Sequence, residues 1–299
     1  MCSSDLRWRD TWLCTIHSTY YHSYLCTCPP EEKGNAVKFR CEREALAEAL
    51  VTAGRAASGR SGAMPAITGL RLELVGDQLT VTATDLDLTI QVVIAVGGDR
   101  DGHAVVPARL TTDIVRSFSS GKVEVEESGD DVVISSGRSQ FSVRPFNYDD
   151  YPKVGVPTTQ AITLSSATFG EALRQVVRAA SSDEQRQAIT GVQMTAEATG
   201  LRMVATDSYR LAIRDLVGEE TLAADQKVLV PARALGELQR LVNGADTVVM
   251  RLGDRHATFQ VGNTSLTTRL IEQEFPPYRS EEHTSELQSL RHLVCRLLL

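Results

Sequence analysis

Two carboxylates separated by a single residue, Asp85 and Asp87, are candidates for metal-dependent chemistry. Residues two apart on a strand share a face, and paired carboxylates can hold the metal ion that assists phosphoryl transfer. A metal-dependent nucleotidyl-transfer enzyme that uses Asp85 and Asp87 is therefore one interpretation. The later segment Asp207-Ser208-Tyr209 is similar but lacks the second carboxylate. Because the sequence also contains no Gly-rich phosphate loop, nucleophile elbow or His–carboxylate constellation, we expect a protein that is not an enzyme and uses no cofactor.

A second group of possible metal ligands lies near the N-terminus. It consists of Cys14, His17, His22, Cys26 and Cys28. The Cys-x-Cys pair within it is tighter than the spacing of common zinc sites, so we expect no metal site there.

Arginines are concentrated in four segments with helical character. These segments carry eight arginines and five acidic residues, whereas the rest of residues 37–278 carries 17 basic and 26 acidic residues. Arg109 and Arg116 are seven residues apart, as are Arg233 and Arg240, which places each pair on one helical face. Such a surface can contact the phosphates of duplex DNA without reading its sequence. Few aromatic residues accompany the arginines, so stacking on single-stranded bases is not indicated.

An ordinary solvated helix surface is the alternative interpretation. Arg109 and Asp113 have the i,i+4 spacing of a surface ion pair, and so do Arg233 and Glu237. A protein-interaction scaffold that does not bind DNA would need nothing more. Because the arginine pairs recur in both halves of an otherwise acidic body, in a chain of net charge -7, we favour a phosphate-facing surface.

The elements that would position these arginines occur twice. Five short motifs recur in the same order at an offset of 122 to 124 residues; they begin at Glu48-Ala49-Leu50, Thr68-Gly69, Ala83-Thr84-Asp85, Val106-Pro107-Ala108-Arg109 and Tyr151-Pro152. A repeat of this length indicates a tandem domain duplication, with a boundary in the turn-forming segment 152–159. We therefore expect domain 1 at 37–157 and domain 2 at 158–278.

Each repeat has the pattern of an α+β domain. A short strand, Val37–Cys41 or Ala161–Leu164, precedes a helix with an apolar stripe, and Ser166 lies in the predicted cap region of the second helix. Alternating apolar residues then predict antiparallel strands. Each Val-Pro-Ala-Arg motif begins a second helix, because proline suits the first helical turn. The expected architecture is two helices packed on antiparallel sheet in each repeat.

The two ends of the chain differ from this body. Residues 1–36 show neither helical nor strand periodicity, and residues 279–299 resemble translated sequencing-adapter DNA. We therefore interpret 1–36 as a non-native or disordered leader and 279–299 as an adapter-like tail. No segment has the length and apolar character of a membrane span, no signal peptide is apparent, and residues 37–278 contain a single cysteine, Cys41. We expect a cytoplasmic protein that does not contact membranes.

Several motifs resemble the β subunit of bacterial DNA polymerase III, the β sliding clamp. They are Val37-Lys38-Phe39, Ala83-Thr84-Asp85-Leu86-Asp87, Val106-Pro107-Ala108-Arg109, Ser136-Gly137-Arg138-Ser139-Gln140-Phe141 and Ala205-Thr206-Asp207-Ser208-Tyr209-Arg210-Leu211-Ala212. The resemblance extends over residues 37–278 and implies tandem DNA-clamp domains in a head-to-tail homodimeric ring. It also implies a processivity factor that encircles duplex DNA and tethers the polymerase during DNA replication. The tail at 279–299 then stands where a third domain should begin.

The resemblance also implies partners and site residues. The partners would be double-stranded DNA, bound without sequence specificity, the DNA polymerase III catalytic subunit, the clamp-loader ATPase and other proteins with a clamp-binding motif. The second domain's half of the partner-peptide pocket would consist of Ile189, Thr206, Ser208, Tyr209, Arg210, Leu211 and Pro276. Tyr209 stands where some members have histidine, which alters the pocket wall. The candidates for DNA contact are Arg60, Arg109, Arg116, Arg174, Arg178, Arg186, Arg233 and Arg240.

Overall fold

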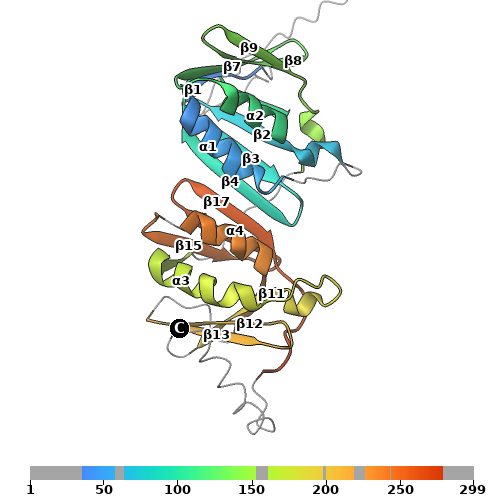
Figure 1. The fold of residues 1–299 in the computed structure, drawn as a ribbon, viewed down its shortest axis with the longest axis vertical. Helices are drawn as coiled ribbons and strands as arrows, with labels where there is room; N and C mark the ends of the chain where they lie inside the picture. The colour runs from blue at the N-terminus through green and yellow to red at the C-terminus, as the bar shows by residue number, and fades with distance from the viewer. Residues whose placement is uncertain are drawn as a thin grey trace, which may run out of the picture. The chain divides into compact units, whose positions relative to one another are not determined.

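A computed structural model describes residues 36–57, 64–152, 161–197, 200–218, 226–242 and 244–278 of the chain (Figure 1). The predicted tail lies outside the described residues, and so does the predicted leader except for residue 36. Arg60, one of the predicted DNA contacts, also lies outside them.

The two repeats contain helices and strands in nearly the same order. In the first they are β1 (Lys38–Glu42), α1 (Arg43–Gly54), η1 (Pro65–Thr68), β2 (Gly69–Val75), β3 (Gln78–Thr84), β4 (Leu88–Ala95), β5 (Gly97–Arg100), β6 (Gly102–Pro107), α2 (Ala108–Ser117), β7 (Lys122–Ser128), β8 (Asp131–Ser136), β9 (Ser139–Val143) and η2 (Tyr148–Asp150). In the second they are β10 (Ala161–Ser165), α3 (Ser166–Val176), η3 (Val177–Ala179), η4 (Gln187–Ile189), β11 (Gly191–Glu197), β12 (Gly200–Thr206), β13 (Leu211–Val217), β14 (Lys227–Pro231), α4 (Ala232–Val242), β15 (Thr247–Leu252), β16 (His256–Val261) and β17 (Thr264–Arg269).

The strands form antiparallel sheets, one of which is shared between the repeats. A five-stranded sheet has the order β5-β1-β7-β8-β9, and a four-stranded sheet has the order β13-β12-β11-β14. The third sheet has the order β10-β15-β16-β17-β4-β3-β2-β6 and so passes from the second repeat into the first. Its continuity depends on the pairing of β17 with β4, which sets Leu266 opposite Ile90 (Figure 1).

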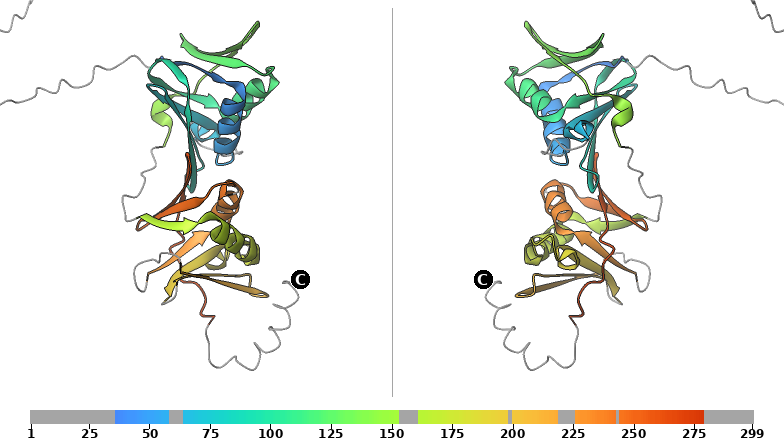
Figure 2. Two further views of the ribbon diagram at one scale, coloured as in Figure 1. Left: turned by 90° about the vertical axis from the view of Figure 1, so that its left-hand side faces the viewer. Right: turned by 90° about the vertical axis from the view of Figure 1, so that its right-hand side faces the viewer.

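The helices of each repeat bury one apolar stripe against a sheet. In α1 the buried residues Leu46, Ala49, Leu50 and Ala53 follow the spacing of a single helical face. Helix α1 packs on β4, and α4 packs on β17. Opposite residues of paired strands point to the same side of a sheet, and Ile90 and Leu266 belong to one apolar core. The helices of both repeats therefore cover the same face of the eight-stranded sheet (Figure 2).

The α+β fold class predicted from the sequence is confirmed, and α2 and α4 begin within the two Val-Pro-Ala-Arg motifs as predicted. Two details of the helix starts are wrong. Ser166 is the first residue of α3, and the cap position is occupied by Ser165, whose side chain makes no capping hydrogen bond. Pro107 is the last residue of β6 and is paired with Gly69, so it precedes the first turn of α2. Pro231 likewise ends β14 before α4. Proline suits this junction because it has no N–H to continue the ladder and its φ already fits the helix that follows.

None of the helices in the described part of the chain has the length and apolar character needed to cross a membrane.

Candidate nucleic-acid interface and partner surface

Three of the predicted DNA-contacting arginines have exposed guanidinium groups. Arg109 and Arg116 lie on α2, and Arg178 lies on η3. All three are exposed and form no ion pair within the described part of the chain, in contrast to the arginines of the next paragraph. Their positive charge is therefore available to an external anion such as a phosphate.

Two other candidates are paired along their own helix. Arg174 Nε donates to Glu171 Oε2 at 2.9 Å, and Arg240 Nη1 lies 2.8 Å from Glu237 Oε1. The hydrogen bond from Arg174 lowers the pKa of Glu171, so this carboxylate is ionised at neutral pH and offsets the arginine charge. A carboxylate offsets the charge of each of these arginines, so we expect them to attract DNA phosphates less strongly than the three unpaired arginines.

The remaining candidates point to other partners. Arg186 Nε donates to Asp183 at 2.9 Å, and its Nη1 donates to Ser208 Oγ at 3.2 Å. Arg186 thus belongs with the predicted partner pocket. Arg233 Nη1 lies 2.7 Å from Asp85 Oδ2 in the other repeat.

The i,i+4 pairs expected for an ordinary helix surface do not form. No ion pair joins Arg109 to Asp113 or Arg233 to Glu237 among the described residues. The second of these pairs is replaced, since Arg233 contacts Asp85 and Glu237 is bound by Arg240 three residues later. Glu237 also lies 4.0 Å from Arg55 of the first repeat.

The predicted carboxylate pair does not lie on a strand. Asp85 and Asp87 occupy the turn between β3 and β4. Asp85 Oδ1 accepts hydrogen bonds from the backbone N–H groups of Asp87 at 3.2 Å and Leu88 at 2.7 Å, while Oδ2 faces Arg233. Side-chain acceptance from the residues that follow is the usual role of Asp in a turn, and it leaves this carboxylate engaged in structure. The described residues contain no cluster of metal-ligating side chains around it.

The equivalent turn in the second repeat is built in the same way. Asp207 Oδ1 accepts from the backbone N–H groups of Tyr209 and Arg210, both at 3.0 Å. Its Oδ2 lies 3.0 Å from Arg210 Nε, so this ion pair stays within the turn. Leu86 and Ser208 hold the same place in the two turns and both adopt positive φ, 82° and 78°. The turn is thus a repeated feature. The turn of the first repeat also contacts the second repeat, through the ion pair of Asp85 with Arg233 and through the Asp87 carbonyl, which accepts from the N–H of Arg269 at 2.8 Å.

We expect Asp85→Ala to lower the free energy of unfolding by about 2 kcal/mol, because two backbone N–H groups lose their acceptor and Arg233 loses its partner. Asp85 is 11% exposed and Arg233 is 66% exposed at the side chain, so Arg233→Ala should cost less than about 1 kcal/mol. Urea unfolding of both variants measures the difference. The matched control is Asp207→Ala. This change removes the equivalent acceptor from the turn of the second repeat, where the aspartate forms no ion pair with the other repeat among the described residues. Equal effects of Asp85→Ala and Arg233→Ala would contradict this assignment.

The predicted pocket residues Thr206, Ser208, Tyr209, Arg210 and Leu211 form one turn between β12 and β13. Thr206 Oγ1 donates to the carbonyl of Arg210 at 2.7 Å and accepts from the N–H of Ser208 at 3.1 Å. These contacts leave the Tyr209 side chain 86% exposed. The turn therefore presents a tyrosine ring and a half-buried leucine at the end of the strands.

An apolar cluster lies beside this turn. Val204, Leu229 and Phe275 are buried in it, and Leu211, Ile271 and Tyr278 pack against them. The cluster forms because the segment after β17 returns over β14, where the N–H of Ile271 donates to the carbonyl of Leu229 at 2.9 Å. Pro276 is exposed next to Phe275, whereas Ile189 is 4% exposed at the end of η4.

Sequence reasoning missed Val204, Leu229 and Phe275 as members of this surface. The recurrence of Tyr151-Pro152 as Phe275-Pro276 could have indicated Phe275. The equivalent segment of the first repeat also returns over its sheet, since the N–H of Phe146 donates to the carbonyl of Val105 at 2.7 Å.

Comparison with known proteins supplies the family. The family model described as the DNA polymerase III beta subunit, N-terminal domain, matches residues 37–155, and the model for the central domain of the same subunit matches residues 163–277. The beta sliding clamp of Synechocystis is 32% identical to this chain over 81% of the chain and 68% of that protein. The chain belongs to the bacterial β sliding clamp family.

Further relatives agree with this assignment. The beta sliding clamp of Streptomyces coelicolor is 28% identical over 82% of the chain and 66% of that protein. The solved clamp of C. crescentus has a TM-score of 0.77 at 28% identity, covering 82% of this chain and 67% of that one. The clamp from Bacillus subtilis also has a TM-score of 0.77, at 26% identity, covering 83% of this chain and 67% of that one. The chain spans about two thirds of the length of the clamp relatives that it matches.

Membership of the clamp family confirms the resemblance on which the sequence analysis relied. The family is one of processivity factors for DNA replication that carry out no catalysis themselves. The interpretation of Asp85 and Asp87 as a metal-dependent catalytic pair is wrong, because Asp85 is the acceptor of a turn and a partner of Arg233.

Proposed function

We propose that this chain forms part of a closed ring that encircles duplex DNA, and that it tethers the DNA polymerase III catalytic subunit and other proteins with a clamp-binding motif. The observation that carries the proposal is the pairing of β17 with β4, by which one repeat extends the sheet of the next. Domain 1 at 37–157 and domain 2 at 158–278 are the units that this pairing joins. The ranges matched by the two family models support that division.

The internal repeat indicates how further units would join. Gly137 and Gly262 occupy equivalent turns, with φ of 61° and 58°, and the residues four positions later are Phe141 and Leu266. Leu266 is fully buried, because β4 covers its strand. Phe141 is 43% exposed on β9, which pairs only with β8 among the described strands. Strand β9 thus presents the edge that β17 already uses, which supports head-to-tail assembly with a second copy of the chain.

Because β17 pairs with β4, the strand that would pair with β9 should be an equivalent of β4. Its counterpart in the second repeat is β13, which pairs only with β12 in the described part of the chain. Exposed sheet edges of this kind pair readily with another chain. A ring removes such edges by closing on itself, and this supports encirclement over an open scaffold.

The exposed arginines support the proposal that the ring encircles DNA. Arg109, Arg116 and Arg178 lie on helical segments that carry free positive charge on a protein of net charge -7. A local basic surface on an acidic body attracts the DNA backbone while limiting adhesion elsewhere. Because these contacts would be made to phosphates, we propose binding without sequence specificity.

The second-repeat turn and its apolar cluster form the proposed partner surface. This surface comprises Thr206, Ser208, Tyr209, Arg210 and Leu211 with Ile189, Pro276 and the cluster around Phe275. Exposed Tyr209 and half-buried Leu211 provide an aromatic and an aliphatic contact of the kind found at protein interfaces. We propose the polymerase and a clamp-loading ATPase as its partners in the cytoplasm, with no cofactor bound by the clamp.

Topological retention on DNA tests the ring. The protein loaded by its ATPase should remain on nicked circular DNA at high salt and should slide off linear DNA of the same sequence. A purely electrostatic binder would leave both as the salt concentration rises. Gel filtration of the DNA-bound fraction measures the two populations. Equal loss from circular and linear DNA would contradict encirclement.

A further inference from the structure

The Thr-Gly motif that recurs in the two repeats places a glycine at the start of a strand in each. Gly69 is the first residue of β2 and Gly191 is the first of β11, and they lie opposite Pro107 and Pro231, the last residues of β6 and β14. Neither glycine has a positive φ, so a residue with a side chain could adopt the same backbone conformation. The reason for a glycine must therefore lie in its surroundings.

The space next to Gly191 is filled by residues of the proposed partner surface. A Cβ atom at this position would lie 2.8 Å from Ile271 Cδ1, 2.9 Å from Leu229 Cδ1 and 2.9 Å from the Val230 carbonyl oxygen. Carbon atoms in contact lie about 3.5–4.0 Å apart, so even the methyl group of an alanine would displace these groups. Ile271 and Leu229 both belong to the apolar cluster of the partner surface.

Ile271 begins the segment 271–278, which contains the last residues of the proposed partner surface. The N–H of Ile271 donates to the Leu229 carbonyl at 2.9 Å, so both its backbone and its side chain hold the segment against the sheet. Phe275 is buried four residues later, and Pro276 is exposed beside it. The positions of Phe275 and Pro276 thus depend on how closely Ile271 approaches β11 and β14.

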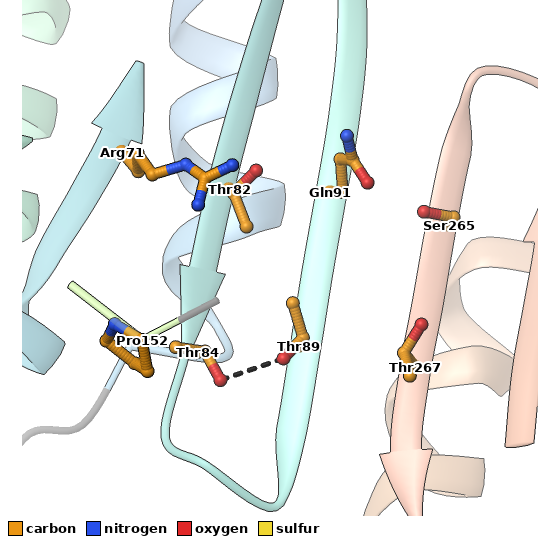
Figure 3. A pocket seen from close by; sticks show the side chains of 8 residues that line it. All are labelled: Arg71, Thr82, Thr84, Thr89, Gln91, Pro152, Ser265 and Thr267. Carbon is orange, nitrogen blue, oxygen red and sulfur yellow. Dashed lines mark hydrogen bonds between the residues drawn. The ribbon is translucent and has the colours of Figure 1, made fainter. Parts of the chain in front are cut away.

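The first repeat has an equivalent arrangement that leads to a different surface. A Cβ atom at Gly69 would lie 2.9 Å from Val105 Cγ1 and 3.0 Å from Phe146 Cδ2, and the N–H of Phe146 donates to the Val105 carbonyl at 2.7 Å. The segment that follows ends at a polar pocket of about 50 Å³, whose wall includes Pro152 and Thr84 (Figure 3). The close approach over a glycine is therefore a repeated feature, but Gly191 is the one that adjoins the proposed partner surface.

A hydroxyl group gives the segment of the first repeat an additional attachment. Tyr151 is buried, and its Oη donates to the Thr82 carbonyl at 3.1 Å. Phe275 has the place of Tyr151 in the second repeat and has no hydroxyl to donate. The segment of the second repeat therefore relies more on its contact with Gly191.

We propose that Gly191 is a positioning residue for partner binding, because the absence of a side chain allows Ile271 to pack against β11 and so holds Phe275 and Pro276 where the partner contacts them. Gly191 is itself buried and acts through Ile271. This role rests on the proposed function, since it presupposes that the partner surface binds the DNA polymerase III catalytic subunit.

Hydrogen exchange on the full chain tests the contact without any partner. Gly191→Ala should speed exchange of the Ile271 N–H about tenfold, as expected when a bond of this kind is weakened, and should leave exchange of the Phe146 N–H unchanged. Gly69→Ala should do the reverse. The two variants are matched, because each adds one methyl group at an equivalent crowded position. Unchanged exchange at Ile271 in Gly191→Ala would overturn the proposal.

Binding of the purified DNA polymerase III catalytic subunit, measured by surface plasmon resonance, separates a positioning role from a purely structural one. Gly191→Ala should weaken the complex about tenfold, whereas Gly69→Ala should leave the affinity unchanged although it crowds the other repeat in the same way. Equal weakening by both variants would overturn the proposal, because a general loss of stability would then explain the result. If the unaltered chain did not bind the polymerase, the partner surface itself would be wrong and this role would fall with it.

Ile271→Ala serves as the second variant if Gly191→Ala does not fold. It leaves the glycine in place and removes the side chain that packs against it. Exchange of the N–H at position 271 should again become faster, and polymerase binding should again weaken. The matched control is Phe146→Ala, which removes the equivalent side chain of the first repeat and should leave polymerase binding unchanged. An unchanged affinity in Ile271→Ala would overturn the proposal.

Discussion

Leu266→Ala is expected to lower the free energy of unfolding by about 3 kcal/mol and to loosen the junction between the two repeats. Leu266 is fully buried and lies opposite Ile90 on the strand that joins them. Its truncation removes apolar contacts and leaves a cavity that neighbouring strands cannot fill without breaking their register. Because α1 packs on β4 and α4 on β17, the loss is felt by the cores of both repeats. Urea unfolding measures the change.

Phe141→Ala is the matched control for this prediction. Phe141 holds the position of Leu266 in the first repeat but is 43% exposed, with one ring contact to Phe118 at 5.6 Å. Its truncation should cost less than about 1.5 kcal/mol in the single chain, because little apolar area is lost. If the β9 edge assembles with a second copy, the same variant should reduce self-association in sedimentation experiments. A larger effect of Phe141→Ala on monomer stability than of Leu266→Ala would contradict the assigned roles of the two edges.

The helices and strands of each repeat could be predicted because they depend on the spacing of apolar residues along short segments. The apolar spacing of Leu46, Leu50 and Ala53 specifies a helical face without knowledge of the sheet that it covers. The alternation of Leu70, Leu72 and Leu74 specifies a strand in the same way. The recurrence of these patterns at a constant offset then gave the α+β class and its duplication.

The pairing of β4 with β17 could not be predicted from such signals. The two strands are separated by more than a hundred residues, and their apolar residues are equally suited to any neighbouring strand. The same limitation explains the error over Asp85. Its partners Asp87 and Leu88 are local, but its ion pair with Arg233 exists only because the junction brings the two repeats together. The residue pattern alone could not distinguish a turn at Asp85 and Asp87 from a strand that carries two carboxylates on one face.

The candidate interfaces could be predicted only in part, because side-chain partners also depend on the folded structure. Helical spacing placed Arg109 and Arg116 on one face, and both are exposed in the structure. It could not show that Arg174 and Arg240 would be held by Glu171 and Glu237, because i,i+3 and i,i+4 partners compete for the same side chain. The burial of Thr82, whose hydroxyl has no partner among the described residues, could also not be predicted. It depends on Tyr151, which donates to the Thr82 carbonyl at 3.1 Å.

The triple change of Arg109, Arg116 and Arg178 to alanine is expected to have the largest effect on DNA binding. If each guanidinium neutralises one phosphate, the slope of log K against log salt concentration should become shallower by about 2.7, and the affinity at ~0.1 M salt should fall by two to three orders of magnitude, as about 0.9 per lost contact predicts. Fluorescence anisotropy with a labelled duplex over a range of salt concentrations measures both quantities.

The structure supplies a control for that experiment in two arginines that are paired with carboxylates. Arg174→Ala combined with Arg240→Ala also removes positive charge from helical segments, but each of these arginines is held by a carboxylate at 2.9 Å or less. Freeing Glu171 and Glu237 adds repulsion at long range, yet no phosphate contact is lost, so the salt slope should change by less than about 1. DNA of different sequence but equal length should give the same result for every variant, because contacts to phosphates carry no base information. If the paired and unpaired arginines proved equivalent, exposure and ion pairing would not decide which residues face the DNA, and the interface would have to be sought on another surface.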